Sequence, residues 1–555
     1  MKNFNFFITV VFYVCYIVYN HDMKNIIKLF IPFLLTSCLV GCGTNYDDNS
    51  SGSSSEKEEE KSVPISGEVT YPTIGGQTQK IKYSYNEDVF KTESVNYSQE
   101  IRDLAFSLNL SSFSVSSDYE EADMQPFQVA TALGYKDPYY SFDEEIDDCT
   151  VFFAHKPVTI SRTNYDILLV LINGWSYKRG WASNFTIGES GDHEGFIISA
   201  DNVEQKILSY MNDKQMDACN TKILITGYSR AAAVSNIISG HIDEAIAGFG
   251  PLKDTTFKNF DYKNLYAYTF ATPAGILSET RARLENQNNI FNFILGNDVV
   301  PYVAPSKEVT TEGSGWDFVR YGTDYYLDNA EESVYNKAQE VFDSYEISSY
   351  EYKAAIKVNP KNISFSDGTL SFVDMEDGEP IVVTELYKNF FKGLTSSEEF
   401  YGDVTRTKLN ECKDAVRWLL VFAFSLDEVT RTALLEAIKS QFSNLGIIKI
   451  LAIVTEIKGA EKPTAETTSE DYPTVKSFLE SIFDEAGIID ETTIKDLNDN
   501  IPYILYLLSK VVTYTLNDIV NFRYIGTLIG NISSTFVSHF PDVYRAWIEA
   551  SKVSA

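Results

Sequence analysis

Residues 226–233 read TGYSRAAA, and this short stretch decides the fold that the sequence predicts. It follows an apolar run at 222–226 and continues into an alanine-rich segment that favours a helix. A strand that ends in Gly-x-Ser-x-small and runs on as a helix makes a sharp turn that exposes the serine hydroxyl. Gly227 and Ala231 lie two residues before and two after Ser229, and their small size lets strand and helix approach each other. The usual second glycine of the motif is Ala231 here, so the interpretation depends on the strand and helix around it.

Strands and helices alternate on both sides of this turn. Residues 165–172 (YDILLVLI) form an almost unbroken apolar run, typical of a strand buried on both faces. The alternation argues for a mostly parallel central sheet with helices on both faces, and therefore for an α/β domain. The other expected elements are a hairpin over 69–90 with Gly75-Gly76 near its turn, helices over 97–108, within 118–133, over 196–211 and from Arg230, and strands over 222–226, 265–270 and 290–295.

A serine nucleophile needs a general base, normally a histidine that a carboxylate orients. In hydrolases with this turn, both partners follow the serine in the order Ser, Asp, His. The chain has five histidines, of which His21, His155 and His193 precede Ser229. His241 lies about three turns into the helix that Ser229 begins, near its far end. Elimination therefore leaves His539 as the base.

Asp298 is the candidate for the orienting acid. It follows the apolar strand at 290–295 and precedes a Val-Val-Pro corner, which places it at the strand end where such sheets hold their sites. The alternative is that Asp298 only caps a turn, as Asp often does. The oxyanion site would use the backbone N–H of Arg230, together with that of Trp175 or Ser176 in the loop after the first buried strand.

Composition excludes one class of partner and gives no sign of a cofactor. The 555 residues carry 46 Lys and Arg against 78 Asp and Glu, a net charge of −32. Nucleic-acid binding needs a basic surface, so nucleic acid is excluded as the main partner. Of the six cysteines, those beyond residue 42 are widely spaced, which speaks against a disulfide framework or a zinc site. We expect no metal and no organic cofactor.

The N-terminal residues resemble an export signal. From Met23 the chain reads MKNIIKLFIPFLLTSCLVGCG, which has two lysines, a short apolar run and then small residues. The sequence LVGC ending at Cys42 resembles the bacterial lipobox, whose cysteine is acylated; Cys38 is the second choice, and a plain signal peptide or signal anchor is the alternative. We therefore expect a leader over 1–41, a lipid-anchored disordered tether over 42–64, and a protein held on the outer face of the bacterial cell membrane. A second apolar stretch at 6–19, upstream of this signal, indicates that Met23 is the true start; the alternative is an additional membrane helix.

The region from 326 to 525 differs from the alternating part of the chain. It is helix-rich, with apolar stretches such as Trp418–Phe424 and 501–512, and residues 461–472 indicate an exposed linker. An apolar stretch of this kind is usually packed inside its own helical group. The alternative is a lid whose apolar face covers an acyl pocket.

Several ordered motifs resemble the class 3 (fungal-type) lipases, especially the bacterial lipase-family proteins of that group. They are NGW at 173–175, WASNF at 181–185, HEGF at 193–196, GYSR at 227–230, TFATP at 269–273, NDVVP at 297–301 and HFPDVYRAW at 539–547.

This resemblance, which covers roughly residues 95–325 and 530–550, implies an α/β-hydrolase fold and hydrolysis of carboxylic esters. It also implies a triad of Ser229, Asp298 and His539, with His193 structural. The family's Gly-Thr after the first strand is Gly174-Trp175 here, which changes the side chain next to the oxyanion hole. The 241 residues between Asp298 and His539 exceed the family's usual spacing.

We therefore expect the hydrolase core over 65–325, a helical cap or lid over 326–525, and a return to the core over 526–555. The leading hypothesis is a membrane-anchored hydrolase of acyl esters such as glycerides or phospholipids. The alternative is a catalytically inactive surface lipoprotein that uses the same fold for binding. A separation of more than one water molecule between the Ser229 and His539 side chains would favour the binding protein.

Overall fold

The computed structural model describes most of the chain beyond residue 63. The described residues are 64–72, 78–115, 120–142, 147–174, 180–296, 298, 300–302, 317–327, 332–345, 363–366, 369–372, 406–407, 410–426, 428–517 and 539–552. The expected leader over 1–41, with Met23 and Cys38, lies outside them, as do the tether up to residue 63, with Cys42, and the oxyanion candidates Trp175 and Ser176.

A seven-stranded sheet forms the centre of the molecule, with strand order β11-β9-β7-β6-β5-β4-β3. The five strands from β5 to β11 run parallel, whereas β4 and β3 extend the sheet in antiparallel fashion. The predicted mostly parallel sheet is therefore confirmed. Its strands are β3 (Lys136–Ser141), β4 (Val151–Ile160), β5 (Thr163–Ile172), β6 (Thr221–Tyr228), β7 (Leu265–Phe270), β9 (Ile290–Ile294) and β11 (Thr323–Tyr326).

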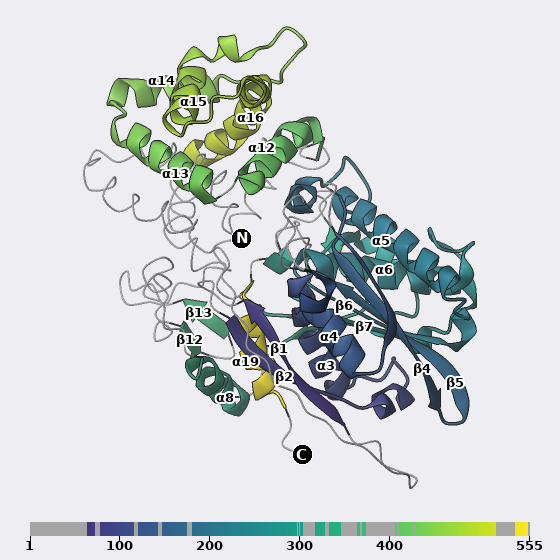
Figure 1. Ribbon diagram of the computed structural model, residues 1–555. Coiled ribbons are helices and arrows are strands. Elements are labelled where there is room, and N and C mark those ends of the chain that lie inside the picture. Colours follow the sequence, from purple (N-terminus) through teal and green to yellow (C-terminus); the bar gives the residue numbers. More distant parts are fainter. Residues whose placement is uncertain are drawn as a thin grey trace.

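The sheet is covered on both faces. Along β5, Ile167, Leu169 and Leu171 belong to one hydrophobic cluster, while the alternate residues between them belong to another. One cluster includes helices α5 (Glu194–Asp213) and α6 (Arg230–Ile246) (Figure 1). The other includes α3 (Gln99–Ser111), α4 (Gln125–Ala132), α8 (Glu332–Asp343), α19 (Pro541–Ala550) and the antiparallel hairpin of β1 (Ile65–Pro72) and β2 (Thr78–Tyr85).

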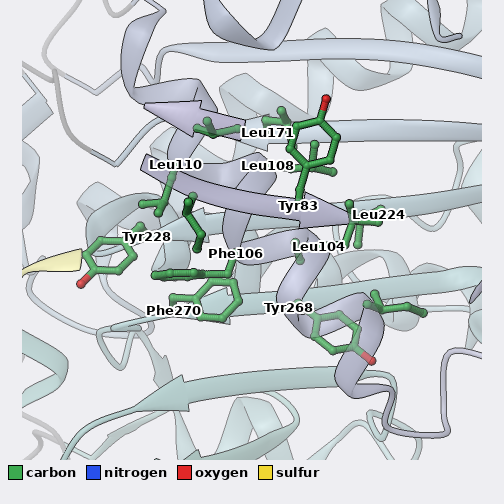
Figure 2. Close-up of a cluster of buried hydrophobic side chains, with 14 of the residues drawn as sticks. Tyr83, Leu104, Phe106, Leu108, Leu110, Leu171, Leu224, Tyr228, Tyr268 and Phe270 are labelled. Atoms are coloured by element: carbon green, nitrogen blue, oxygen red, sulfur yellow. The ribbon is translucent and has the colours of Figure 1, made fainter. Parts of the chain in front are cut away.

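Aromatic side chains fill the interior beneath the turn that carries Ser229. Phe106 of α3 packs edge-on against Phe270 of β7, with ring centroids 4.9 Å apart. Phe113 makes a similar contact with Tyr228, at 6.1 Å. Figure 2 shows Phe106, Tyr228 and Phe270 gathered with leucines from α3 and the sheet. The residue before Ser229 is therefore held by large buried rings rather than by a flexible loop.

Residues 406–517, which we call the helical segment, have a hydrophobic core of their own. Their helices are α12 (Lys413–Ser425), α13 (Glu428–Ser443), α14 (Ile447–Lys458), α15 (Pro473–Glu485) and α16 (Glu491–Asn517), drawn in green shades apart from the sheet in Figure 1. Trp418 and Phe422 pack against this core, stacked on each other at 5.6 Å. Residues 461–472 form a mostly exposed connection, as predicted. Among the described helices, none has the length and apolar character needed to span a membrane.

Helix α8 corrects the expected boundary between core and insertion. It begins at Glu332, inside the region assigned to the insertion, yet Ala338 and Phe342 belong to the same hydrophobic cluster as α19. The first part of the core therefore continues through Tyr345 rather than ending at 325. The reason is that α8 buries its apolar face against α19 instead of joining the helical segment. The remaining short elements are β8 (Ile276–Leu277), α7 (Ser278–Ala282), β10 (Phe318–Val319), β12 (Ile363–Ser366) and β13 (Thr369–Phe372).

Candidate active site

Ser229 occupies a strained position between β6 and α6. Its backbone has φ 59° and ψ −132°, a region that non-glycine residues rarely enter and that costs on the order of 1–3 kcal/mol. The N–H of Ser229 donates to the carbonyl of Phe270 at 3.0 Å, which holds the turn against β7. A Cβ at Gly227 would meet the carbonyl oxygen of Ala231 at 2.2 Å, so this position requires glycine. The methyl group of Ala231 itself is fully buried, so the departure from glycine there is accommodated.

The structure brings the three predicted side chains into one hydrogen-bonded chain. His539 Nε2 lies 2.8 Å from Ser229 Oγ, and His539 Nδ1 lies 2.7 Å from Asp298 Oδ2. Ser229 follows β6, Asp298 follows β9, and His539 precedes α19, so three distant parts of the chain meet at one edge of the sheet. These are the contacts that a serine nucleophile, a general base and an orienting acid require.

Asp298 is fixed by further donors. Its Oδ2 also accepts a hydrogen bond from the hydroxyl of Tyr544 at 2.8 Å, and its Oδ1 accepts from the backbone N–H of Val300 at 2.9 Å. Tyr544 in turn accepts from the N–H of Leu295 at 3.2 Å. The bond to Val300 is the turn cap that the alternative interpretation of Asp298 proposed. Capping and contact with His539 coexist, because the two carboxylate oxygens face different partners.

His539 is held through its backbone as well as its ring. The hydroxyl of Tyr228 donates to the carbonyl of His539 at 2.8 Å, and the two rings lie 5.6 Å apart. Tyr228 immediately precedes Ser229, so the residue next to the nucleophile positions the base. Sequence reasoning missed Tyr228 and Tyr544 in these roles. The position of Tyr544, five residues after His539 in a matching motif, was the signal that could have found it.

Arg230 has a second role beyond its predicted backbone N–H. It is the first residue of α6, so its N–H lies at the helix N-terminus beside Ser229, where the helix dipole favours negative charge. Its side chain is buried and donates to Ser183 Oγ at 2.9 Å, to Ser199 Oγ at 2.5 Å and to Cys149 Sγ at 3.0 Å. The guanidinium therefore ties α6 to α5 and to the short helix Gly180–Phe185.

The end of β5 passes very close to the turn. A Cβ at Gly174 would meet the carbonyl oxygen of Tyr228 at 2.1 Å, so glycine is required here too. Gly174 therefore lies against the backbone of Tyr228, the residue before Ser229. The predicted second oxyanion donors, Trp175 and Ser176, belong to this loop but lie outside the described residues.

The three side chains are covered in this conformation. Ser229 exposes 4% of its surface, His539 2% and Asp298 none.

His193 caps a helix, consistent with the structural role assigned from the resemblance. It is the N-cap of α5, where its Nδ1 accepts a hydrogen bond from the N–H of Phe196 at 3.3 Å. Its ring also stacks on that of Phe196, with centroids 3.9 Å apart. Complete burial lowers the pKa of His193 to about 3, so the ring is neutral.

A central parallel sheet covered by helices on both faces, with a serine on a sharp strand–helix turn, is an α/β-hydrolase fold, as predicted. No family model matches the chain, and neither does any curated protein. Similar solved structures include a triacylglycerol lipase whose catalytic centre is a serine protease triad, at 18% identity over 42% of this chain and 82% of that chain, with a TM-score of 0.29.

Two further similar structures are also lipases. A fungal lipase in complex with an inhibitor is 17% identical over 42% of this chain and 81% of that chain, with a TM-score of 0.28. Rhizomucor miehei triacylglyceride lipase is 18% identical over 42% of this chain and 82% of that chain, with a TM-score of 0.30.

Proposed function

We propose that this protein is a serine hydrolase that cleaves carboxylic esters of the acyl-lipid class. The observation that carries the proposal is the hydrogen-bonded chain from Ser229 Oγ through His539 to Asp298, with links of 2.8 and 2.7 Å. The strained backbone of Ser229 supports it, because strain at a single polar residue is typical of functional sites.

The chemistry follows from the order of these contacts. Ser229 Oγ attacks the ester carbonyl carbon while His539 Nε2 takes the hydroxyl proton, and Asp298 holds the imidazole in position. The tetrahedral intermediate collapses to an acyl-enzyme as His539 returns the proton to the departing alcohol. Water, activated by the same histidine, then attacks the acyl-enzyme and releases the carboxylic acid and Ser229.

The developing oxyanion needs donors placed before the reaction begins. We assign one of them to the backbone N–H of Arg230 at the start of α6, and the second to Trp175 or Ser176. The side-chain contacts of Arg230 support this assignment, because they hold the first turn of α6 against the short helix that follows the oxyanion loop.

The lipid class of the substrate rests on the motif resemblance and on the proposed location of the protein. We propose that the chain is exported and anchored through an acylated Cys42, which would keep the active site close to a membrane. Mass spectrometry of the N-terminal peptide from membrane-extracted protein tests the anchor. A diacylated Cys42 at the new N-terminus supports it, whereas an unmodified cysteine, or cleavage elsewhere, contradicts it.

The alternative is a binding protein that has lost catalysis. A direct contact of 2.8 Å between Ser229 Oγ and His539 Nε2 supports the enzyme over this alternative, since a decayed site has no need to keep the contact.

The decisive experiment uses the purified full chain in mild detergent, with a fluorophosphonate probe and a series of p-nitrophenyl esters of increasing acyl length. We expect labelling of Ser229, and turnover that is lost in both Ser229→Ala and His539→Ala. The dependence on acyl length separates an esterase from a lipase. A folded wild-type protein that neither labels nor hydrolyses any ester would favour the binding protein.

A further inference from the structure

A second group of reactive side chains lies between α5 and α6, away from the triad. It consists of Asp201 and Glu204 on α5 and His241 on α6, and one ligating atom from each lies within 4.8 Å of the other two. Glu204 is 2% exposed and His241 5% exposed, whereas Asp201 is open to solvent. His241 Nδ1 contacts Glu204 Oε1 directly, at 2.7 Å.

Helix geometry explains the convergence. Asp201 and Glu204 are three residues apart, so they lie on the same face of α5. Helices α5 and α6 pack against each other (Figure 1), and His241 of α6 contacts Glu204 of α5. His241 lies twelve residues beyond Ser229 on the same helix, about 18 Å along its axis at 1.5 Å per residue. The group is therefore separate from the proposed active site.

Buried carboxyl groups lie beside the imidazole. Glu204 contacts His241 directly, and Glu244, three residues beyond His241 on α6, is also buried. A bound cation would offset the cost of burying these carboxylates.

Glu244 is fixed by other partners. It lies about one turn beyond His241 on α6, and the hydroxyl of Tyr321 donates to its Oε1 at 2.9 Å. Gly250 packs on the same side chain, because a Cβ at that position would lie 2.3 Å from Glu244 Oε2.

The dimensions suit a small ion. Three atoms no more than 4.8 Å apart all lie within about 2.8 Å (4.8/√3) of a common centre, so reaching the roughly 2.0–2.2 Å of Zn–N and Zn–O bonds needs shifts of up to about 0.6–0.8 Å. One imidazole among the ligands favours Zn²⁺ and similar transition metals over Ca²⁺ or Mg²⁺. The exposed Asp201 side provides an entry path and room for water ligands.

We propose that Asp201, Glu204 and His241 form a binding site for a divalent transition-metal ion, with Zn²⁺ as its best representative, that ties α5 to α6. Such an ion would stabilise the two helices that position the candidate active site. Helix α6 begins next to Ser229, and Ser199 of α5 contacts the Arg230 side chain. This site departs from the expectation, drawn from the sequence, that the chain holds no metal. It does not depend on the proposed hydrolase activity.

The test uses the full chain in mild detergent after treatment with a chelator. Isothermal titration with Zn²⁺ is expected to show one site per chain, and Zn²⁺ is expected to raise the melting temperature, whereas Ca²⁺ and Mg²⁺ at the same concentration do not. Asp201→Asn is expected to weaken Zn²⁺ binding by about tenfold or more, in line with the loss seen when groups around a metal are removed. His241→Gln is expected to abolish binding.

His155→Gln is the matched control. His155 also contacts two carboxylates, Asp137 and Asp166, but through different ring nitrogens, at 3.0 and 3.2 Å, so they do not converge on one point. Its Zn²⁺ binding should equal that of the wild type. Because Asp201 is exposed, Asp201→Asn should fold even if His241→Gln does not. Unchanged Zn²⁺ affinity in Asp201→Asn, no binding by the wild type, or equal stabilisation by Ca²⁺ would overturn the proposal.

Discussion

The sheet-based core and the helical segment are built on different principles. The core joins residues that are remote in sequence, as when Tyr71 of β1 donates to Asp542 of α19 at 2.9 Å across 471 residues. The helical segment packs consecutive helices around its own hydrophobic cluster, and no hydrophobic cluster of described residues includes side chains from both. Several of the described contacts between them are polar. Buried Arg406 donates to the carbonyls of Ile187, Gly188 and Gly191, and Arg417 pairs with Asp147.

The candidate active site in the core and the helical segment beside it are therefore structurally separable. The candidate active site depends on long-range contacts within the core, so it is rigid only when the whole core is folded. Polar contacts at this boundary gain little from the hydrophobic effect, and the partly exposed pair of Arg417 and Asp147 is open to screening by salt. We therefore expect changes in the core to alter catalysis or global stability, and changes at the boundary to alter how the helical segment is attached.

Removing the orienting acid gives the largest expected effect. Asp298→Asn keeps the size of the side chain but removes the charge that holds the imidazole, and the corresponding change in serine proteases lowers kcat about 10⁴-fold. Steady-state hydrolysis of p-nitrophenyl butyrate measures the loss, and circular dichroism should show an unchanged fold. A loss of less than about tenfold would contradict the assigned role.

Lowering the pH should reduce the stability of the core through protonation of His193. Its pKa in the folded state, about 3, lies below the ordinary 6.5, so the unfolded chain binds the proton first. The stabilisation of the folded state by neutral His193 is complete above about pH 6.5. The free energy of unfolding falls by about 1.4 kcal/mol per pH unit between there and about pH 3. Residues 406–517 contain no histidine, so the helical segment lacks this effect.

Urea unfolding of wild-type protein and His193→Asn, at about pH 7.5 and about pH 5, measures the difference. Asparagine can also cap a helix, so the variant should fold. Between the two pH values, the free energy of unfolding of the wild type should fall by about 2 kcal/mol more than that of the variant. The reason is that about 1.5 pH units of this interval lie below pH 6.5. Equal losses in the two proteins would show that His193 does not set the acid response.

Arg406 makes three hydrogen bonds across the boundary. Its three donors lie 2.9–3.1 Å from the carbonyl oxygens, so Arg406→Gln should weaken attachment of the helical segment by about 2–3 kcal/mol. Hydrogen exchange is the measurement, with faster exchange expected at 186–195 and unchanged exchange in β6. An increase throughout the sheet would mean that the two regions unfold together.

Tyr544→Phe tests how much the hydrogen bond from Tyr544 to Asp298 contributes to the site. The ring stays, but Asp298 loses one donor while it keeps the N–H of Val300. We expect kcat to fall about tenfold, the cost of roughly one hydrogen bond to a charged group, with KM unchanged. A change in KM alone would place Tyr544 in substrate binding instead.

The smallest effect is expected at the exposed edge of the boundary. Arg417 and Asp147 form a partly exposed pair at 2.7 Å, and pairs of this kind contribute about 1 kcal/mol or less. Arg417→Gln should lower the melting temperature slightly in dilute buffer and not at all in high salt, where the pair is already screened. A loss that persists in high salt would indicate a packing role for the arginine stem.

Sequence reasoning went furthest where composition limited the choices. Five histidines and a required chain order led to His539, and apolar runs located four of the five parallel strands of the sheet, all except β11. Strand β4 was not anticipated because His155, Lys156 and Pro157 interrupt its apolar pattern. The partner of Tyr544 lies 246 residues away and that of Arg406 218 residues away, so no local pattern could reveal these contacts. Only the fold brings such residues together.

The distance in sequence between the proposed nucleophile and base also determines when each is synthesised during translation. His539 lies 310 residues after Ser229, so a growing chain contains the complete strand–helix turn around Ser229 well before it contains the proposed base. At about 5–20 residues per second, translation of that interval takes roughly 15–60 s. The nascent chain therefore lacks the proposed base while the helical segment is being made. The proposed activity can arise only after His539 has joined Ser229 and Asp298, which couples its appearance to the completion of the fold.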